Sequence, residues 1–338
     1  MLTTRIINPK MIIQFAWRLQ AVCIAISGLV FFLHDILDIK SIAIPFLPVA
    51  TIGTAVAFYV GFKNNSAYDR LWEARRVWGS ITNATRMWGA MVMDVVASRD
   101  KGSAEAYAAK KELLYRHLAW LNMLRLQLRR NPVFKESWYV RSPKLQVVKD
   151  IFGENKFEPQ AEEVMHKFLS EEDRKLFEGK ANIASAIMKR QNEELIEIKN
   201  KGWLDELEHS DMGKLVLEFY NQQGASERIK SFPFPRQYAS FSTAFVFIFI
   251  FLLPFSIIGE LAKLNSNINW LVIPFTMLIA WVFAVMEQIG DASENPFDNG
   301  VNDIPMTAIC RNLEIELREM LGEKELPPRI EPVQGILM

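Results

Sequence analysis

Hydrophobic and polar positions are grouped in long blocks, and four of the hydrophobic blocks are long enough to cross a membrane. Spanning the hydrocarbon core takes about 20 mostly apolar residues, because lipid offers no water to the backbone. Three blocks contain no charged residue: Ser41 to Phe62, Tyr238 to Gly259 and Leu264 to Met286. The fourth, near Trp17 to Leu37, is uncharged only from Leu19 to Leu33, so an interfacial helix is its alternative.

Basic residues beside these blocks predict their orientation. They precede the first span, follow the second, precede the third and follow the fourth. The set is Arg5, Lys10 and Arg18; Lys63, Arg70, Arg75 and Arg76; Arg228, Lys230 and Arg236; Arg311 and Arg318. The short connections, Asp38 to Lys40 and about Glu260 to Lys263, carry little charge. By the positive-inside rule, we expect a multi-pass protein of the cell's inner (plasma) membrane with both termini in the cytoplasm.

The stretch between the two membrane hairpins has helical periodicity. Helices are predicted from Asn65 past Met93 and from Glu105 to Arg130. Shorter ones are predicted for Glu162 to Phe168, Ala181 to Lys199 and Met212 to Asn221. Turns are predicted at Asn131-Pro132, Ser142-Pro143 and Glu158-Pro159, and a stiff elbow at Phe232-Pro233-Phe234-Pro235.

The predicted fold is therefore an all-α integral membrane protein with four transmembrane helices and a large helical cytoplasmic region. We divide the chain into residues 1–62, the N-terminus and first hairpin (spans about 17–37 and 41–62); 63–236, the cytoplasmic helical region; 237–290, the second hairpin (spans about 238–259 and 264–286); and 291–338, a cytoplasmic C-terminal segment.

Composition and motifs argue against several classes of function. The formal net charge is zero, which gives no reason to expect nucleic acid as a partner. The sequence lacks the common nucleotide-binding, hydrolase, zinc-protease and Cys-x-x-Cys motifs. One Glu-x-x-His pair, Glu163 and His166, is too few for a di-iron bundle. The remaining histidines, His34, His117 and His209, stand alone and are interpreted as surface or core residues. We predict no enzyme, no metal and no cofactor.

The second span presents Thr54, Phe58 and Phe62 on one helix face, because they recur every four residues. Many other positions of this span are Ala or Gly, which let neighbouring helices approach closely. Spacing alone favours phenylalanines in lipid or in the protein core. The alternative is a narrow pore: if several copies arrange this helix around an axis, the phenylalanines form rings that can gate by dewetting.

Several segments resemble the bestrophin family, particularly its prokaryotic members. Gly61 to Arg75 resembles the segment that follows the family's second span. Phe234 to Tyr238 is similar to the family's entry to the third span, and Trp17-Arg18 fits its first span. Asn295-Pro296-Phe297-Asp298 is similar to the Asn/Asp-Pro-Phe-Gly motif after the fourth. The matches follow the family's order across most of the chain, although about Asp100 to Lys180 carries little of the resemblance.

The resemblance implies a homopentameric ion channel in which Thr54, Phe58 and Phe62 line a neck on the five-fold axis. Thr54 is a departure, because the family commonly has a branched aliphatic residue there. The family also has an apolar cytoplasmic aperture, for which Ile198 is the best match and Ile196 or Leu195 are alternatives.

Calcium-activated members hold calcium with a run of acidic residues after the Asn-Pro-Phe motif. Only Asp298 and Asp303 remain in this sequence, whereas calcium takes about six to eight oxygen ligands. We therefore interpret this region as a vestigial calcium clasp and expect no calcium gating. The alternative is that both residues cap the helix starting near Pro305.

The expected permeant ion is a monovalent anion such as chloride. The neck positions carry no charge, and phenylalanine rings present an electropositive edge. Lys63, just beyond the neck, would raise the local anion concentration, unless it snorkels or pairs with Asp69. The alternatives are a monovalent cation (sodium) channel of the same family and a non-conducting membrane scaffold. The expected partners are further copies of the chain, membrane lipid and the permeant ions.

Overall fold

The computed structural model describes residues 1, 3, 9–98, 100, 102–130, 157–232, 234–300, 302–333 and 335–338, without the side chains of residues 9–16. Within these residues the named elements are all helical, and one isolated bridge joins Val333 and Ile336. The turns predicted at Asn131-Pro132 and Ser142-Pro143 lie outside the described residues.

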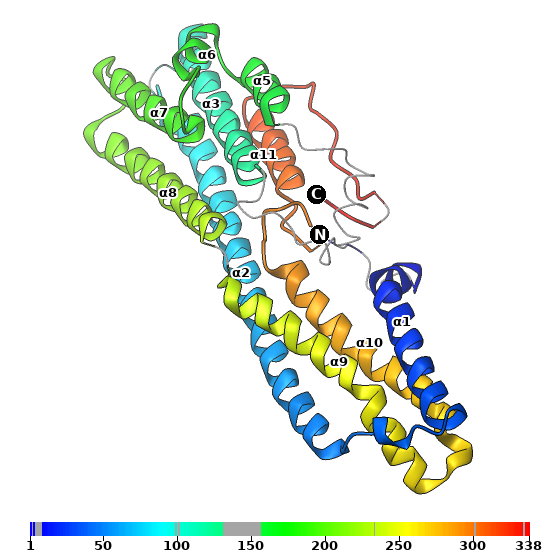
Figure 1. Cartoon of the computed structure of the whole chain (residues 1–338). Helices are drawn as coiled ribbons and strands as arrows, with labels where there is room; N and C mark the ends of the chain where they lie inside the picture. The colour runs from blue at the N-terminus through cyan, green and yellow to red at the C-terminus, as the bar shows by residue number, and fades with distance from the viewer. Residues whose placement is uncertain are drawn as a thin grey trace.

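Four apolar helices form what we call the membrane bundle (Figure 1). They are α1 (Pro9–Phe31), the first part of α2 (Phe46–Asp94), α9 (Arg236–Leu264) and α10 (Val272–Ser293). Short helical turns, η1 (Phe32–Ile36), η2 (Lys40–Ile42) and η3 (Ser266–Leu271), belong to the connections at one end of this bundle. The four predicted spans are confirmed. The predicted connection from Glu260 to Lys263 is wrong, because α9 continues through it to Leu264.

Apolar side chains of α2 and α9 make up much of the membrane bundle's core. Val49, Val56 and Val60 of α2 belong to the same buried cluster as Val246 and Phe249 of α9. Gly53 faces the Phe249 ring, and a Cβ atom at this glycine would lie 2.6 Å from a ring carbon. The glycine therefore allows α2 and α9 to approach closely, which fixes the rotation of α2 in the bundle.

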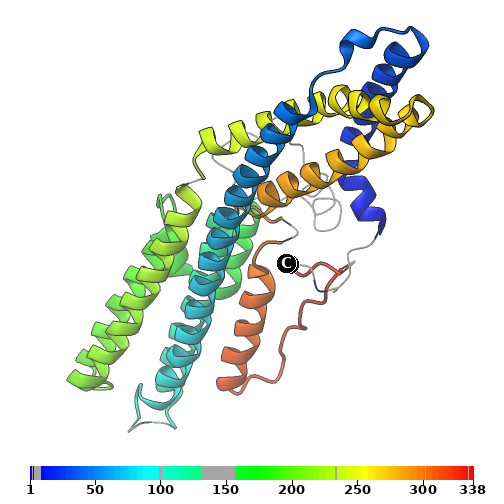
Figure 2. The ribbon, with the colours of Figure 1, turned by 90° about the horizontal axis from the view of Figure 1, so that it is seen from below.

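Helix α2 is continuous for 49 residues and leaves the membrane bundle without a break (Figure 2). At 1.5 Å per residue it is about 70 Å long. The sequence suggested a span ending at Phe62 and a separate helix from Asn65. The structure joins them, because no proline interrupts α2 after Pro48 and its buried stripe continues through Ala67 and Ala74.

The distal part of α2 packs against α8, α11 and α3 in a second bundle, which we call the distal bundle (Figure 2). The other members are α3 (Ala104–Leu128), α5 (Phe157–Phe168), α6 (Glu171–Phe177), α7 (Ile183–Asn200), α8 (Glu206–Ser231) and α11 (Met306–Met320). Trp78, Trp88, Trp120 and Phe219 are among its largest buried side chains. Ser103, Ser170, Asn182 and Asp205 cap the N-termini of α3, α6, α7 and α8. Pro159, predicted to mark a turn, lies in the first turn of α5, where a proline is tolerated.

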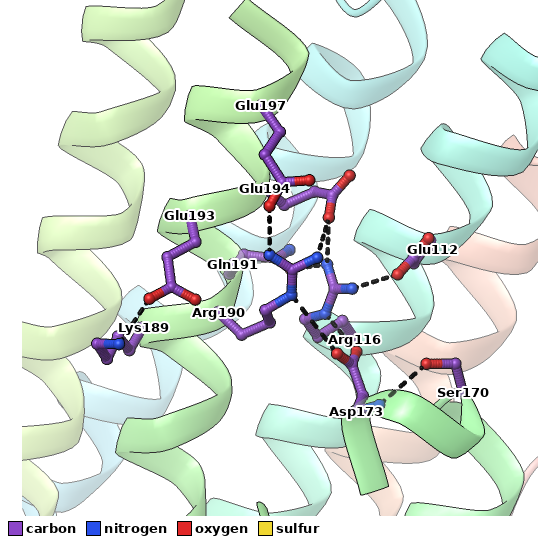
Figure 3. Close-up of polar contacts among 10 residues, drawn as sticks. All are labelled: Glu112, Arg116, Ser170, Asp173, Lys189, Arg190, Gln191, Glu193, Glu194 and Glu197. Atoms are coloured by element: carbon purple, nitrogen blue, oxygen red, sulfur yellow. Dashed lines mark hydrogen bonds and ion pairs between the residues drawn. The ribbon is translucent and has the colours of Figure 1, made fainter. Parts of the chain in front are cut away.

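A charged network holds α3, α6 and α7 together (Figure 3). The guanidinium group of Arg116 is fully buried and its Nε donates to Asp173 Oδ2 over 2.7 Å. Arg190 Nε of α7 lies 3.6 Å from Asp173 Oδ1 of α6, and Arg116 Nη1 of α3 lies 3.8 Å from Glu194 Oε2 of α7. Because a buried charge is tolerated only when it is paired, these contacts fix the three helices relative to one another.

Candidate functional site

One side of α2 is uncovered along almost its whole length. Its residues recur at spacings of three and four, so they share one face of the helix. This open face consists of Leu47, Thr51, Thr54, Phe58, Phe62, Asn65, Asp69, Trp72, Arg76, Gly79, Asn83 and Met87, all of which are exposed. The opposite side is buried, with Val56, Val60, Ala67 and Ile81 among its residues. The described residues of a single protomer thus leave the open face uncovered.

The predicted neck residues all belong to the open face. Phe58 is 66% exposed and Phe62 is 64% exposed. The Thr54 hydroxyl donates to the Ala50 carbonyl over 3.1 Å, and the Thr51 hydroxyl donates to the Leu47 carbonyl over 2.9 Å. Because each hydroxyl uses its only hydrogen on the helix, it presents lone pairs, and no donor, to its surroundings.

Lys63 lies on the opposite side of α2 from the neck residues. Its side chain is 1% exposed, and its Nζ lies 2.6 Å from Glu287 Oε1 and 2.5 Å from Asp291 Oδ1. The hydroxyls of Ser242 and Thr243 also donate to Glu287, each over 2.7 Å. The predictions that Lys63 raises the anion concentration at the neck, snorkels, or pairs with Asp69 are therefore wrong.

The rotation of an α-helix explains this placement of Lys63. Nine residues separate Thr54 from Lys63, which is two and a half turns, so the two side chains point in opposite directions. The spacing was visible in the sequence. The partner was not, because Glu287 follows 224 residues later on α10.

The segment that carries the strongest family resemblance fastens α2 to its neighbours. Asn64 Nδ2 donates to the Met286 carbonyl over 3.0 Å. The guanidinium group of Arg70 donates to three carbonyl groups, those of Glu294, Phe232 and Ile229. These contacts attach the rear of α2 to the end of α10 and to the elbow between α8 and α9. The neck residues are thus followed, within about two turns, by polar contacts that fix α2 in the protomer.

The structure places the aperture candidate Ile198 in the core of the distal bundle. Ile198 is 1% exposed and Leu195 is fully buried, whereas Ile196 is 44% exposed. Leu207, which was not among the aperture candidates from the sequence, is 71% exposed in the first turn of α8. The turn before it contacts the distal end of α2, where the Ala97 amide donates to the Trp203 carbonyl over 3.0 Å. An apolar residue between Glu206 and Glu208 was the available signal.

Asp298 and Asp303 are both engaged with other groups of the protein. Asp298 forms an ion pair with Lys230. The Gly300 amide donates to Asp303 Oδ2 over 2.6 Å, and burial raises the pKa of the Asp303 carboxyl to about 7. Helix α11 begins after Pro305 without a side-chain cap, so the prediction that these residues cap it is wrong. Among the described residues, no group of three His, Cys, Asp or Glu side chains is placed to hold a metal ion.

Comparison with known proteins points to one family. A family model described as bacterial and fungal bestrophin protein matches residues 2–319. The voltage-dependent anion channel-forming protein YneE of Escherichia coli (strain K12) is 26% identical over 285 residues, which cover 84% of this chain and 80% of that protein. The voltage-dependent anion channel-forming protein mll4386 of Mesorhizobium japonicum is 27% identical over 291 residues, 85% of this chain and 78% of the relative.

Solved structures match the fold over most of the chain. A mutant of a bacterial bestrophin homolog from Klebsiella pneumoniae superimposes with a TM-score of 0.74 at 20% identity, covering 92% of this chain and 100% of that one. A second structure of this homolog gives a TM-score of 0.73, covering 90% of this chain and 98% of that one, again at 20% identity. The likeness shows that the arrangement of helices is shared.

Proposed function

The chain belongs to the bacterial and fungal bestrophin family, and on this premise we propose that it assembles as a homopentameric channel for monovalent anions such as chloride. The family and its curated relatives are ion channels and not enzymes. The observation that carries the proposal is the open face of α2, where Thr54, Phe58 and Phe62 are exposed in the part of the protomer that the structure describes.

The open face of α2 differs from the surface that α9 exposes. Between Phe241 and Phe251 the exposed residues of α9 are all apolar, with Phe245 and Phe247 among them, as expected for contact with lipid. The open face of α2 includes two threonines there and continues through Asn65 and beyond, where the helix has left the membrane bundle. Lipid cannot cover such a stripe along its whole length. Other copies of α2 around an axis can cover or line all of it.

In such an assembly Phe58 and Phe62 form two stacked rings, and Thr54 forms a third layer. The ring edges are electropositive and therefore favour an anion. Lys63 adds no charge to the passage, because it is buried and paired with Glu287 and Asp291. The anion preference thus rests on the phenylalanine edges, and the names of the curated relatives agree with it.

We place the second constriction at Leu207 in preference to Ile198. A side chain that packs inside one protomer is not free to line a passage between protomers, and Ile198 is 1% exposed. Leu207 is apolar, 71% exposed and located near the distal end of the helix that lines the neck. Ile196 is the second choice.

The proposed topology keeps both termini in the cytoplasm of an inner (plasma) membrane protein. Residues 1–62 and 237–290 form the two membrane hairpins, and residues 63–236 and 291–338 lie on the cytoplasmic side. This arrangement places the distal bundle, and with it Leu207, in the cytoplasm. Asp298 and Asp303 take part in contacts within the protein, and we propose that they have no role in calcium gating.

The experiment is a recording from purified protein in planar bilayers with asymmetric potassium chloride. The reversal potential should lie close to the chloride equilibrium potential, and replacing chloride by gluconate should abolish the anion current. A reversal potential near the potassium equilibrium potential would favour the cation-channel alternative. The absence of current from protein that native mass spectrometry shows to be pentameric would favour the scaffold. A subunit number other than five would contradict the assembly.

A further inference from the structure

A small polar cluster lies at the end of the membrane bundle that faces away from the distal bundle, where the α1–α2 and α9–α10 connections lie (Figure 1). His34 and Asp35 belong to η1, and Asn269 belongs to η3. His34 is 2% exposed and Asn269 is 1% exposed. The element η1 is a π-helical turn, a rare conformation that is frequent at functional sites. The cluster therefore needs an explanation beyond packing.

Three buried acceptor atoms of this cluster have no hydrogen-bond partner. They are Nδ1 of His34, Oδ2 of Asp35 and Oδ1 of Asn269. A buried polar atom without a partner costs stability, so its presence indicates strain, an ordered water or an ion. Three such atoms on side chains that contact one another offer lone pairs but no donor, which suits a cation.

The spacing of His34 and Asp35 fits two ligands of one metal ion. His34 Nδ1 lies 3.5 Å from Asp35 Oδ1, yet the geometry leaves Nδ1 without a hydrogen bond. Zinc binds nitrogen and oxygen ligands at about 2.0–2.2 Å in a tetrahedral arrangement, which separates two ligands by about 3.3–3.5 Å. The two side chains are therefore spaced as co-ligands.

Asn269 orients this arrangement from the other hairpin. Its Nδ2 donates to Asp35 Oδ1 over 2.8 Å, which holds the carboxylate as an outer-shell partner does in metal sites. The Oδ1 atom of the same amide is the third unpartnered acceptor. The cluster thus offers an imidazole nitrogen and a carboxylate as ligands, and water would complete the coordination of a bound ion.

The charges around the cluster also permit a cation. Lys40 Nζ lies 3.8 Å from Asp35 Oδ1 and 3.1 Å from Asp38 Oδ1. Its side chain is 55% exposed, so it lies on the outer side of the cluster. Lys40 lowers the affinity for a cation without neutralising the site.

We propose that His34 and Asp35, held in place by Asn269, bind one divalent transition-metal cation of the zinc type. The ion would fasten the end of α1 to the connection between α9 and α10, and so join the ends of the two membrane hairpins. This site is separate from the open face of α2 and does not depend on which ion the channel passes. It also revises the sequence interpretation of His34 as a solitary core residue.

The test is zinc binding to the full chain in detergent, after treatment with EDTA, followed by calorimetry and thermal unfolding. The wild-type protein should bind one Zn²⁺ per chain and unfold at a higher temperature in its presence. His34→Gln and Asp35→Asn should each weaken binding by about 10-fold or more and remove the thermal shift. Mg²⁺ should leave the unfolding temperature unchanged, because it prefers oxygen ligands.

Asp38→Asn is the matched control for these variants. Asp38 is three residues from Asp35, its side chain is 82% exposed and it pairs with the same lysine, so this variant should bind zinc as the wild type does. X-ray absorption at the zinc edge of the wild-type protein should show one imidazole nitrogen among oxygen ligands, and this measurement does not depend on the variants folding. Zinc binding that is equal in His34→Gln and the wild type, an all-oxygen spectrum, or no saturable binding would each overturn the proposal.

Discussion

The two sides of α2 at the neck differ in a way that is opposite to the usual relation between polarity and exposure. Phe58 and Phe62 on the open face are apolar and uncovered, whereas Lys63 on the rear face is charged and 1% exposed. A soluble protein would bury the rings and expose the ammonium group. Here the charge is satisfied inside the protomer by Glu287 and Asp291, and the rings are left for a partner outside it. The rear face therefore holds α2 in the protomer, whereas the open face remains available for contact with other subunits or with ions.

Removing the rear charge should have the largest effect. Lys63→Met removes the ammonium group that faces the buried Glu287 and the partly buried Asp291, and breaking a buried ion pair typically costs about 3–5 kcal/mol of folding free energy. We expect a large drop in thermal stability in detergent and little assembled protein in size-exclusion chromatography. Adding Glu287→Gln and Asp291→Asn to this variant should restore part of the stability, because no unpaired charge then remains.

Arg76→Met provides the control from the other side of the same helix. Arg76 lies exposed on the open face, so its loss removes a cation without leaving a buried carboxylate unpaired. Its unfolding temperature should stay close to that of the wild type. Equal destabilisation by Lys63→Met and Arg76→Met would show that the rear charge does not anchor α2.

Widening the open face should change permeation and leave stability largely intact. Phe58→Ala with Phe62→Ala removes side chains that are 66% and 64% exposed, so the protomer loses little internal packing. Both rings of the proposed neck become wider and less apolar, and single-channel conductance should rise severalfold. Phe251→Ala removes an equally exposed phenylalanine, 52% exposed on α9, and should leave conductance unchanged. The same conductance in all three proteins would remove the open face from the ion pathway.

The sequence predicted the two sides of α2 unequally well. Helical spacing alone grouped Thr54, Phe58 and Phe62, because periodicity is a local property. The same periodicity would have placed Lys63 on the rear face, yet its partners could not be predicted, since Glu287 and Asp291 approach it only through the packing of α10 on α2. The continuity of α2 was missed because the change from apolar to charged residues after Phe62 resembles the end of a helix.

The four membrane helices could be predicted because of the lipid environment, and not because of helical periodicity. Spans in lipid must satisfy every backbone group internally, so long uncharged blocks leave few alternatives to a helix. The ends of α9 and α10 were less predictable, because Glu260 and Lys263 are compatible with both a loop and a last helical turn. The aperture candidate Ile198 failed to fit because both faces of α7 carry isoleucine or leucine, and only tertiary packing shows which face is buried.

The distal end offers a second comparison between exposed and buried apolar residues. Leu207→Ala shortens a side chain that is 71% exposed, so it should alter the relative permeability of small anions with little change in unfolding temperature. Ile198→Ala, in the core, should do the reverse and cost about 2–5 kcal/mol of stability with unchanged permeability. Ile196→Ala tests whether Ile196, the second candidate for the cytoplasmic constriction, lines the passage. If only Ile198→Ala altered the permeability, Ile198 and not Leu207 would be the aperture residue.

The smallest effect should come from Thr54, which is the one neck position with a polar group. Its hydroxyl donates to the Ala50 carbonyl over 3.1 Å, so the oxygen would offer an anion no hydrogen bond and would act only by keeping this layer wet. Thr54→Val has nearly the same shape without the oxygen, and it should lower conductance about twofold by making the layer drier, while anion preference rises. Thr54→Ser keeps the hydroxyl and should behave as the wild type does. A valine variant with a lower anion preference would mean that the hydroxyl turns toward the ion and donates to it. The Thr54 hydroxyl on the open face would then bind the permeant anion directly, just as Lys63 on the rear face binds Glu287 and Asp291 directly.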